Sequence, residues 1–241
     1  MIYIYIMIYI DKLGLCSNKN LLDIHFTNIF IDKIISYFFP NINDNFVFIE
    51  VGSLHGRDTV DVKDRYKNSI CHCIEGLKPN FDKYLFNFEH LYGITPHNIC
   101  IASYDGKITF HEKKGLESGI HGIYNRGDQY GVKRHEYDCV KFSTFCNNNN
   151  INKLDIMKID IEGATYDILF DMSNSNILNG VKLLHIETES FPFFEGQKLD
   201  NDCYNILESH NFECIMKSGY NPTKEGEQFD SIWINKSYLK I

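Results

Sequence analysis

The sequence predicts a doubly wound α/β fold, in which helices cover both faces of a mostly parallel sheet. Two observations support this prediction. From Asn45 onward, short apolar runs alternate with amphipathic stretches of helical length, and strands separated by helices imply right-handed βαβ crossovers. The chain also has 241 residues, 44% of them hydrophobic, which suffices for one sizeable core. In such sheets ligands bind outside the carboxyl ends of the strands.

The N-terminal part of the chain differs in texture from the rest. We predict an N-terminal extension over residues 1–44 and one domain over residues 45–241. The first ten residues alternate Ile and Tyr, which favours a strand; they are too few to span a membrane, and they lack the basic start of a secretory signal. Apolar residues at helical spacing from Leu22 to Phe38 then predict a covering helix that ends before Pro40.

Within the domain, each element follows from a local pattern. Continuous apolar runs predict the core strands, and a turn at YDGK predicts an extra strand over 108–110. The core strands are expected at 46–52, 70–76, 98–102, 154–160, 181–187, 212–216 and 229–235. Helices are expected at 57–66, 78–91, 165–172 and 203–208, with Pro79 suited to a first helical turn.

The segment from Lys113 to Val140 has repeated glycines, mixed charges and no steady period. Loops of this length are uncommon inside a compact domain, and many of them are lids or binding loops. We therefore predict that this segment surrounds a ligand.

Charge and cysteine usage restrict the partners and the compartment. A net charge of -8 argues against a nucleic acid partner, because binding the phosphate backbone needs clustered Lys and Arg. Eight cysteines without a CxxC pair predict free thiols in a reducing compartment, the cytoplasm. The run Cys71-His72-Cys73 lacks the ligands of a closed zinc site, so we predict no metal there.

Two acidic residues near glycines mark the ends of the first two core strands. Glu50, Gly52 and Gly56 end the first strand, where glycine lets the backbone approach a ligand closely. The dinucleotide pattern G-x-G-x-x-G is absent, and an acid two residues before a glycine suits a ligand with a positive amino group. Glu75 ends the next strand, where a carboxylate can accept both hydroxyls of a ribose; a solvated strand-end acid is the alternative.

Two later strands carry ionisable side chains on one alternating face. Buried charges are costly unless they are paired or bind a ligand, so two neighbouring strands of this kind predict a polar pocket. A structural ion pair is the alternative for the lysine alone. The residues are Lys158, Asp160 and Glu162 on one strand, and His185, Glu187 and Glu189 on the other.

Several stretches, in this order, resemble the FkbM family of S-adenosylmethionine-dependent methyltransferases. The most specific one is IMKIDIEGATYDILF, with its K-x-D-x-E-G-A element. The resemblance covers roughly residues 46–238. The other stretches are FIEVGSLHGRDT, CIEGLKPNF, VKFSTF, HIETESFPFFEGQKL and FDSIWINKSY.

The resemblance implies a class I methyltransferase fold, a seven-stranded sheet whose last strand is antiparallel and pairs with the strand before it. It implies S-adenosylmethionine as the cofactor and O-methylation of a sugar, a glycan or a small natural product. Glu75 would hold the ribose, and Asp160 would lie on the floor of the cofactor and acceptor cleft. The methionine portion would lie against Glu50, Gly52, Ser53 and Gly56.

Methyl transfer to a hydroxyl needs a base, because a hydroxyl is a poor nucleophile until it loses its proton. The candidates are Asp160, His185 and Glu187, and histidine has the pKa nearest to neutral. We predict that Asp160 and His185 address the acceptor, with Lys158 paired to a carboxylate and Glu162 fixing the turn. A divalent metal on Asp160 and Glu187 is an alternative; we predict none.

Two other functions are considered. A nicotinamide-dependent oxidoreductase on a similar fold would bind the dinucleotide, and the missing G-x-G-x-x-G argues against it. A non-catalytic binding protein would bind a ligand without transfer. The acceptor itself is expected near residues 113–140 and the FFEGQKL stretch at 193–199.

Overall fold

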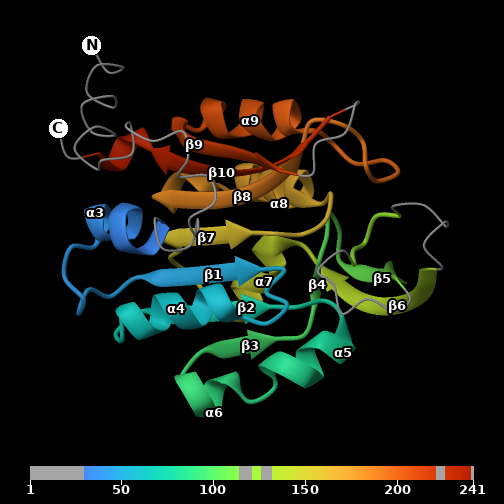
Figure 1. Cartoon of the computed structure of the whole chain (residues 1–241), viewed down its shortest axis with the longest axis horizontal. Coiled ribbons are helices and arrows are strands. Elements are labelled where there is room, and N and C mark those ends of the chain that lie inside the picture. The colour runs from blue at the N-terminus through green and yellow to red at the C-terminus, as the bar shows by residue number, and fades with distance from the viewer. Residues whose placement is uncertain (1–29, 114–120, 126–131, 221–225, 240–241) are drawn as a thin grey trace.

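The fold is built on a seven-stranded sheet, drawn in Figure 1. A computed structural model describes residues 30–113, 121–125, 132–220 and 226–239. The strand order is β3-β2-β1-β7-β8-β10-β9, and all neighbours are parallel except β10, which runs antiparallel to β8 and β9. The strands are β1 (Val47–Val51), β2 (Ile70–Ile74), β3 (Thr95–His97), β7 (Ile156–Ile159), β8 (Leu183–Glu189), β9 (Phe212–Tyr220) and β10 (Gln228–Asn235). The predicted doubly wound sheet of the class I methyltransferase type, with an antiparallel last strand, is confirmed.

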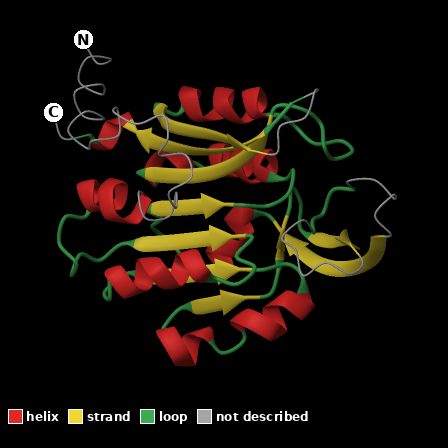
Figure 2. Ribbon diagram, viewed as in Figure 1, coloured by secondary structure: helices red, strands yellow, loops and turns green. Residues whose placement is uncertain are grey.

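Helices cover both faces of this sheet, as Figure 2 shows. One face carries α7 (Phe142–Asn148), α8 (Thr165–Asn174) and α9 (Asp200–Ser209). The other face carries α4 (Arg57–Arg65), α6 (Phe88–Tyr92) and the helical segment formed by a π-helical turn (Phe30–Ile35) and α3 (Ser36–Phe38). Short 3₁₀ turns follow α8 (Ile177–Gly180) and β10 (Lys236–Tyr238).

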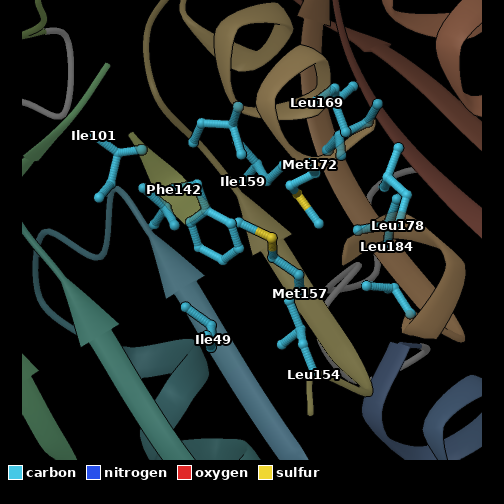
Figure 3. Packing of buried hydrophobic residues seen from close by; sticks show 14 of the residues in the cluster. Ile49, Ile101, Phe142, Leu154, Met157, Ile159, Leu169, Met172, Leu178 and Leu184 are labelled. Carbon is cyan, nitrogen blue, oxygen red and sulfur yellow. The ribbon is translucent and has the colours of Figure 1, made fainter. Parts of the chain in front are cut away.

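Each face of the sheet has its own apolar core. Alternate residues of a strand point to opposite faces, so neighbouring positions of one strand contribute to different cores. Figure 3 shows the core beneath α7 and α8, where strand residues such as Ile49, Met157 and Leu184 meet Phe142 and Met172. The opposite core contains Phe48, Cys71, Cys73, Ile156 and Leu183 from the strands, and Val62 and Tyr66 from the region of α4.

The predicted helix over 78–91 is interrupted. It consists of α5 (Lys78–Asn80), a π-helical turn (Phe81–Leu85) and α6, and Pro79 lies in its first turn as expected. Asn87 has non-helical backbone angles and separates the last two pieces. Leu85 and Phe88 of this segment are buried against the sheet.

A second, three-stranded sheet was only partly predicted. Its order is β4 (Cys100–Ile101), β6 (Val132–Val140) and β5 (Gly106–Lys113), and it lies beyond the carboxyl ends of β1 and β7 (Figure 1). The apolar run at 98–102 therefore belongs to this small sheet, and the main sheet is continued instead by β3, which was not predicted. The expectation of a loop over 113–140 was wrong for β6; residues 114–120 and 126–131 lie outside the described part.

The described part of the N-terminal segment is helical from Phe30 to Phe38, and Pro40 follows. Ile34 and Ile35 are buried against the sheet. The strand expected in the first ten residues and the start of the predicted helix lie outside the described residues. Among the helices that the structure describes, none combines the length and apolar character needed to cross a membrane.

Candidate functional site

A pocket opens at the carboxyl ends of β1, β2 and β7, on the side of the small sheet. In a doubly wound sheet this is where ligands bind, because the chain crosses to opposite faces after neighbouring strands. Gly52, Glu75 and Asp160, which the sequence singled out, all line the pocket. The other lining residues used below are Leu54, Asn80, His121, Gly122, Ile123 and Glu162.

Gly52 brings the turn after β1 against the end of β7. Its φ of +82° is in the left-handed region, where a side chain is strained. A Cβ atom there would lie 1.7 Å from the carbonyl oxygen of Asp160. Only glycine therefore permits this close approach of the two backbones beneath the pocket.

Glu75 is buried and holds the turn that follows Gly52. Its Oε2 accepts a hydrogen bond from the amide of Leu54 (3.0 Å), and its Oε1 accepts one from the amide of Leu77 (2.8 Å). Burial raises the pKa of Glu75, and the two amides oppose that rise. Leu54 has a φ of 44°, a left-handed conformation that is uncommon for a residue with a side chain. The carboxylate is thus fixed at the pocket by the two amides, and the side chain of Asn80 also donates to it.

Lys158 lies at the centre of a cluster of three carboxylates. Its Nζ is 2.5 Å from Asp58 Oδ2, 3.2 Å from Asp160 Oδ2 and 3.5 Å from Glu50 Oε1. These carboxylates hold the pKa of Lys158 well above its usual value despite burial. The ammonium therefore stays charged and fixes one oxygen of Asp160 at the edge of the pocket.

Glu50 lies beneath the pocket and does not line it. It is 2% exposed and accepts hydrogen bonds from the amide (3.1 Å) and the hydroxyl of Thr59, at the start of α4. Burial raises the pKa of Glu50 to about 7; Lys158 acts in the opposite sense, and Asp58 adds to the rise. Glu50 thus joins β1 to α4, and any effect on a ligand passes through Lys158.

Lys158→Met is expected to lower the free energy of unfolding by about 3 kcal/mol at pH 8, because breaking a buried ion pair leaves uncompensated charge. Burial already raises the folded-state pKa of Glu50 above its unfolded value, and without the lysine that pKa rises further. The folded protein then binds more protons than the unfolded chain, so stability falls as pH rises. Urea unfolding should show a smaller deficit at pH 5 than at pH 8.

The matched control for this prediction is Lys67→Met, which removes an exposed ion pair with Asp64. It should change stability by no more than about 0.5 kcal/mol at either pH. A deficit of Lys158→Met that is equal at both pH values would contradict the electrostatic explanation.

Ser53 and Gly56 serve the packing of the turn. The Ser53 hydroxyl donates to the carbonyl of Glu50 (3.0 Å) and accepts from the amide of Ile74 (3.1 Å), which ties β1 to β2. Gly56 has a φ of +63°, and a Cβ there would clash with the ring of Phe88 on α6. Neither residue lines the pocket, although both shape the turn that does.

His185 and Glu187 lie on β8, one strand further from Gly52. His185 is opposite Lys158 in the strand register, its side chain is 6% exposed, and its Nε2 is 3.1 Å from Asp230 Oδ1 on β10. Glu187 Oε1 accepts from Gln228 Nε2 at 3.3 Å. Of the three predicted catalytic residues, the structure thus places only Asp160 in the pocket wall.

Three buried carboxylates approach one another beside the pocket. Glu162, Glu187 and Glu189 offer oxygens that all lie within 4.8 Å of each other, and Glu162 also lines the pocket. Oxygen donors of this kind suit a divalent cation such as Mg²⁺. The metal alternative weighed from the sequence joined Asp160 to Glu187, whereas the structure groups Glu187 with Glu162 and Glu189.

Most of the chain matches the model of one protein family. Residues 50–214 match the methyltransferase FkbM domain, which is more than half of the chain. The chain belongs to the FkbM methyltransferase family. No curated protein matches the sequence.

Solved structures with a fold similar to that of this FkbM domain include methyltransferases and a pre-rRNA processing protein. TrmK of M. capricolum with S-adenosyl-homocysteine is 13% identical over 84% of this chain and 68% of that chain, with a TM-score of 0.44. Magnesium protoporphyrin IX methyltransferase of Synechocystis PCC 6803 with bound SAM is 10% identical over 95% of this chain and 91% of that chain, with a TM-score of 0.45. The fibrillarin pre-rRNA processing protein of Methanococcus jannaschii is 14% identical over 81% of this chain and 69% of that chain, with a TM-score of 0.44.

Several residues at the site of the FkbM domain were not found from the sequence. Asp58 is the nearest partner of Lys158, and an acid in the first turn of α4 was its only signal. Leu54 lines the pocket through a left-handed backbone conformation that no pattern marks. Asn80 also lines the pocket, and its side chain donates to Glu75. The described segment 121–125 reaches the pocket from within the predicted loop, which indicated the region without the residues.

Proposed function

We propose that this FkbM-family protein is an S-adenosylmethionine-dependent methyltransferase that methylates a hydroxyl oxygen on a sugar, a glycan or a small natural product. The observation that carries the proposal is the pocket bounded by Gly52, Glu75 and Asp160 at the carboxyl ends of β1, β2 and β7. The net charge of -8 supports an acceptor other than nucleic acid, and free thiols among the described cysteines support the cytoplasm.

The residues of the pocket fit the cofactor. When bound, S-adenosylmethionine supplies a methyl group activated by a sulfonium. Glu75 would accept hydrogen bonds from the ribose hydroxyls, because its carboxylate lies in the pocket wall and is held there by the amides of Leu54 and Leu77 and the side chain of Asn80. Gly52 lines the pocket without a side chain, which lets the ends of β1 and β7 meet closely at the proposed cofactor site. The carboxylates of Asp160 and Glu162 favour the positive charge of this cofactor over a phosphate-bearing one.

Asp160 is the base that the geometry supports best. It lines the pocket, it is 38% exposed, and Lys158 engages its Oδ2. A carboxylate so held can accept the proton of an acceptor hydroxyl while the oxygen attacks the methyl group in line. His185 is the second candidate; its buried ring and its pairing with Asp230 leave it further from the pocket wall. Glu187 is the third.

The proposal is tested by calorimetry on the full chain with S-adenosylhomocysteine and, in parallel, with NAD⁺. We expect one molecule of S-adenosylhomocysteine to bind and NAD⁺ not to bind. Binding of NAD⁺ alone would indicate an oxidoreductase, and binding of neither ligand would overturn the proposal. If the protein binds S-adenosylhomocysteine but transfers no methyl group to any hydroxylated acceptor, it is a non-catalytic binding protein.

Asp160→Asn is expected to retain S-adenosylhomocysteine binding within about fivefold and to lower the rate of methyl transfer by 10²-fold or more, because general bases contribute about 10²–10⁴-fold. His185→Ala should lower the rate if His185 shares this role. Release of S-adenosylhomocysteine from S-adenosylmethionine and an acceptor measures the rate.

Asp138→Asn, at an exposed ion pair with Lys107 on the small sheet, is the control and should leave the rate unchanged. Full activity of both Asp160→Asn and His185→Ala would remove the proposed base. In that case, activity that is lost in EDTA and restored by Mg²⁺ would indicate that a metal ion activates the acceptor hydroxyl. Glu162, Glu187 and Glu189 would hold that ion.

A further inference from the structure

The described segment 121–125 forms one wall of the pocket. His121, Gly122 and Ile123 line it. Gly122 pairs with His111 at the end of β5, where the His111 amide donates to the Gly122 carbonyl at 2.8 Å. The segment therefore extends the small sheet toward the end of β7.

Gly122 packs directly on the turn that follows β7. A Cβ atom at Gly122 would lie 3.2 Å from the carbonyl oxygen of Glu162 and 3.3 Å from its Cβ. A side chain at position 122 would therefore press on the K-x-D-x-E-G-A element, and glycine lets the segment approach it closely. Movement of the segment away from this turn would open the pocket along the edge that Glu162 forms.

Two hydrogen bonds hold the segment on its far side. The Tyr124 hydroxyl donates to Asp167 Oδ2 in the first turn of α8 at 2.9 Å. The amide of Glu195 donates to the carbonyl of Asn125 at 2.9 Å. Burial raises the pKa of Tyr124, and Asp167 raises it further, so the hydroxyl remains a donor.

The second of these bonds reaches the loop that follows β8. Glu195 belongs to the FFEGQKL stretch, and a Cβ at the neighbouring Gly196 would come within 3.9 Å of the Tyr124 ring. Phe194, in the same loop, packs against the face of Gly163 in the turn after β7. One segment thus contacts the cofactor pocket on one side and the loop expected to surround the acceptor on the other.

We propose that Tyr124 is a positioning residue that, through Asp167, holds segment 121–125 as a common wall of the cofactor pocket and the acceptor site. The inference rests on the proposed function. Because this wall closes the pocket along the edge formed by Glu162, the Tyr124–Asp167 bond should lengthen the time for which the cofactor stays bound. An acceptor that contacts the loop at Glu195 would stabilise the same wall, so the two ligands bind cooperatively.

The test measures S-adenosylhomocysteine dissociation from the immobilised full chain by surface plasmon resonance. Tyr124→Phe should raise the dissociation rate about tenfold, because a hydrogen bond to a charged group is lost, and should leave the association rate within about twofold. The melting temperature without ligand should fall by no more than about 4 °C, as expected for the loss of one hydrogen bond. Asp167→Ala should have the same effect, and the double variant should dissociate no faster than either single variant.

Tyr104→Phe is the matched control. Tyr104 lies in the exposed turn before β5, and its hydroxyl donates to the carbonyl of Lys107 at 3.0 Å. This variant should leave the dissociation rate unchanged. The inference would be overturned if Tyr124→Phe released S-adenosylhomocysteine at the wild-type rate, or if the double variant multiplied the increases in dissociation rate of the two single variants. The proposed function would stand in either case. Failure of the wild type to bind S-adenosylhomocysteine would instead reject the proposed function.

Discussion

Glu75→Ala is expected to weaken S-adenosylhomocysteine binding about 100-fold, since it removes two charge-assisted hydrogen bonds to the proposed ribose. The change also leaves the amides of Leu54 and Leu77 without their acceptor, so the turn above Gly52 loses its fixed shape. Calorimetry on the wild type and the variant measures the difference. Glu75→Gln should also bind weakly, because its amide nitrogen would face one of those backbone amides.

Asp64→Asn removes an exposed acid of α4 that pairs with Lys67, and it controls for the loss of one negative charge. It should bind S-adenosylhomocysteine like the wild type. If Glu75→Ala is folded and binds within threefold of the wild type, the assignment of the ribose to Glu75 is wrong, although the pocket would remain a cofactor site.

Gly52→Ala is expected to abolish measurable S-adenosylhomocysteine binding and to lower the free energy of unfolding by about 3 kcal/mol or more. The added Cβ would lie 1.7 Å from the carbonyl oxygen of Asp160, and backbone cannot move aside as a flexible side chain can. The φ of +82° adds strain of about 1–3 kcal/mol for a residue with a side chain. Calorimetry and urea unfolding measure the two effects.

Gly180→Ala is the matched control, because nothing lies within 4 Å of a Cβ at that position in the turn after α8. It should be neutral in both assays. A Gly52→Ala protein with wild-type binding and stability would show that the turn after β1 adapts, and the close approach of the β1 and β7 ends would then have no role in the site.

The main sheet was predictable because most of its strands are apolar runs bounded by helices, as at 46–52 and 154–160. Two strands escaped for physical reasons. Strand β3 is short, lies at the sheet edge and contains Pro96, which is tolerated there because one side of an edge strand needs no ladder hydrogen bonds. Strand β6 mixes charged residues with Tyr137 and Cys139, because it belongs to a ribbon whose side chains are largely exposed.

The lining of the pocket was predictable for Gly52, Glu75 and Asp160, because the carboxyl ends of neighbouring parallel strands meet at one edge of the sheet. Alternation along β8 put His185 on the same face as Glu187, but it could not show that Asp230 of the antiparallel neighbour would pair with the ring. The partnership of Asp58 with Lys158 depends on where α4 begins relative to β7. Contacts between elements 100 residues apart leave no local trace in the sequence.

The pairing of β1 with β7 also has a consequence for how the chain acquires its structure. Glu50 and Lys158 are 108 residues apart, so the floor of the pocket forms only when most of the domain has been synthesised. Contacts of such long sequence separation slow folding, because a large loop must close before they form. S-adenosylhomocysteine should therefore raise the melting temperature and slow unfolding, and an unchanged refolding rate would show that the site is completed only after the transition state.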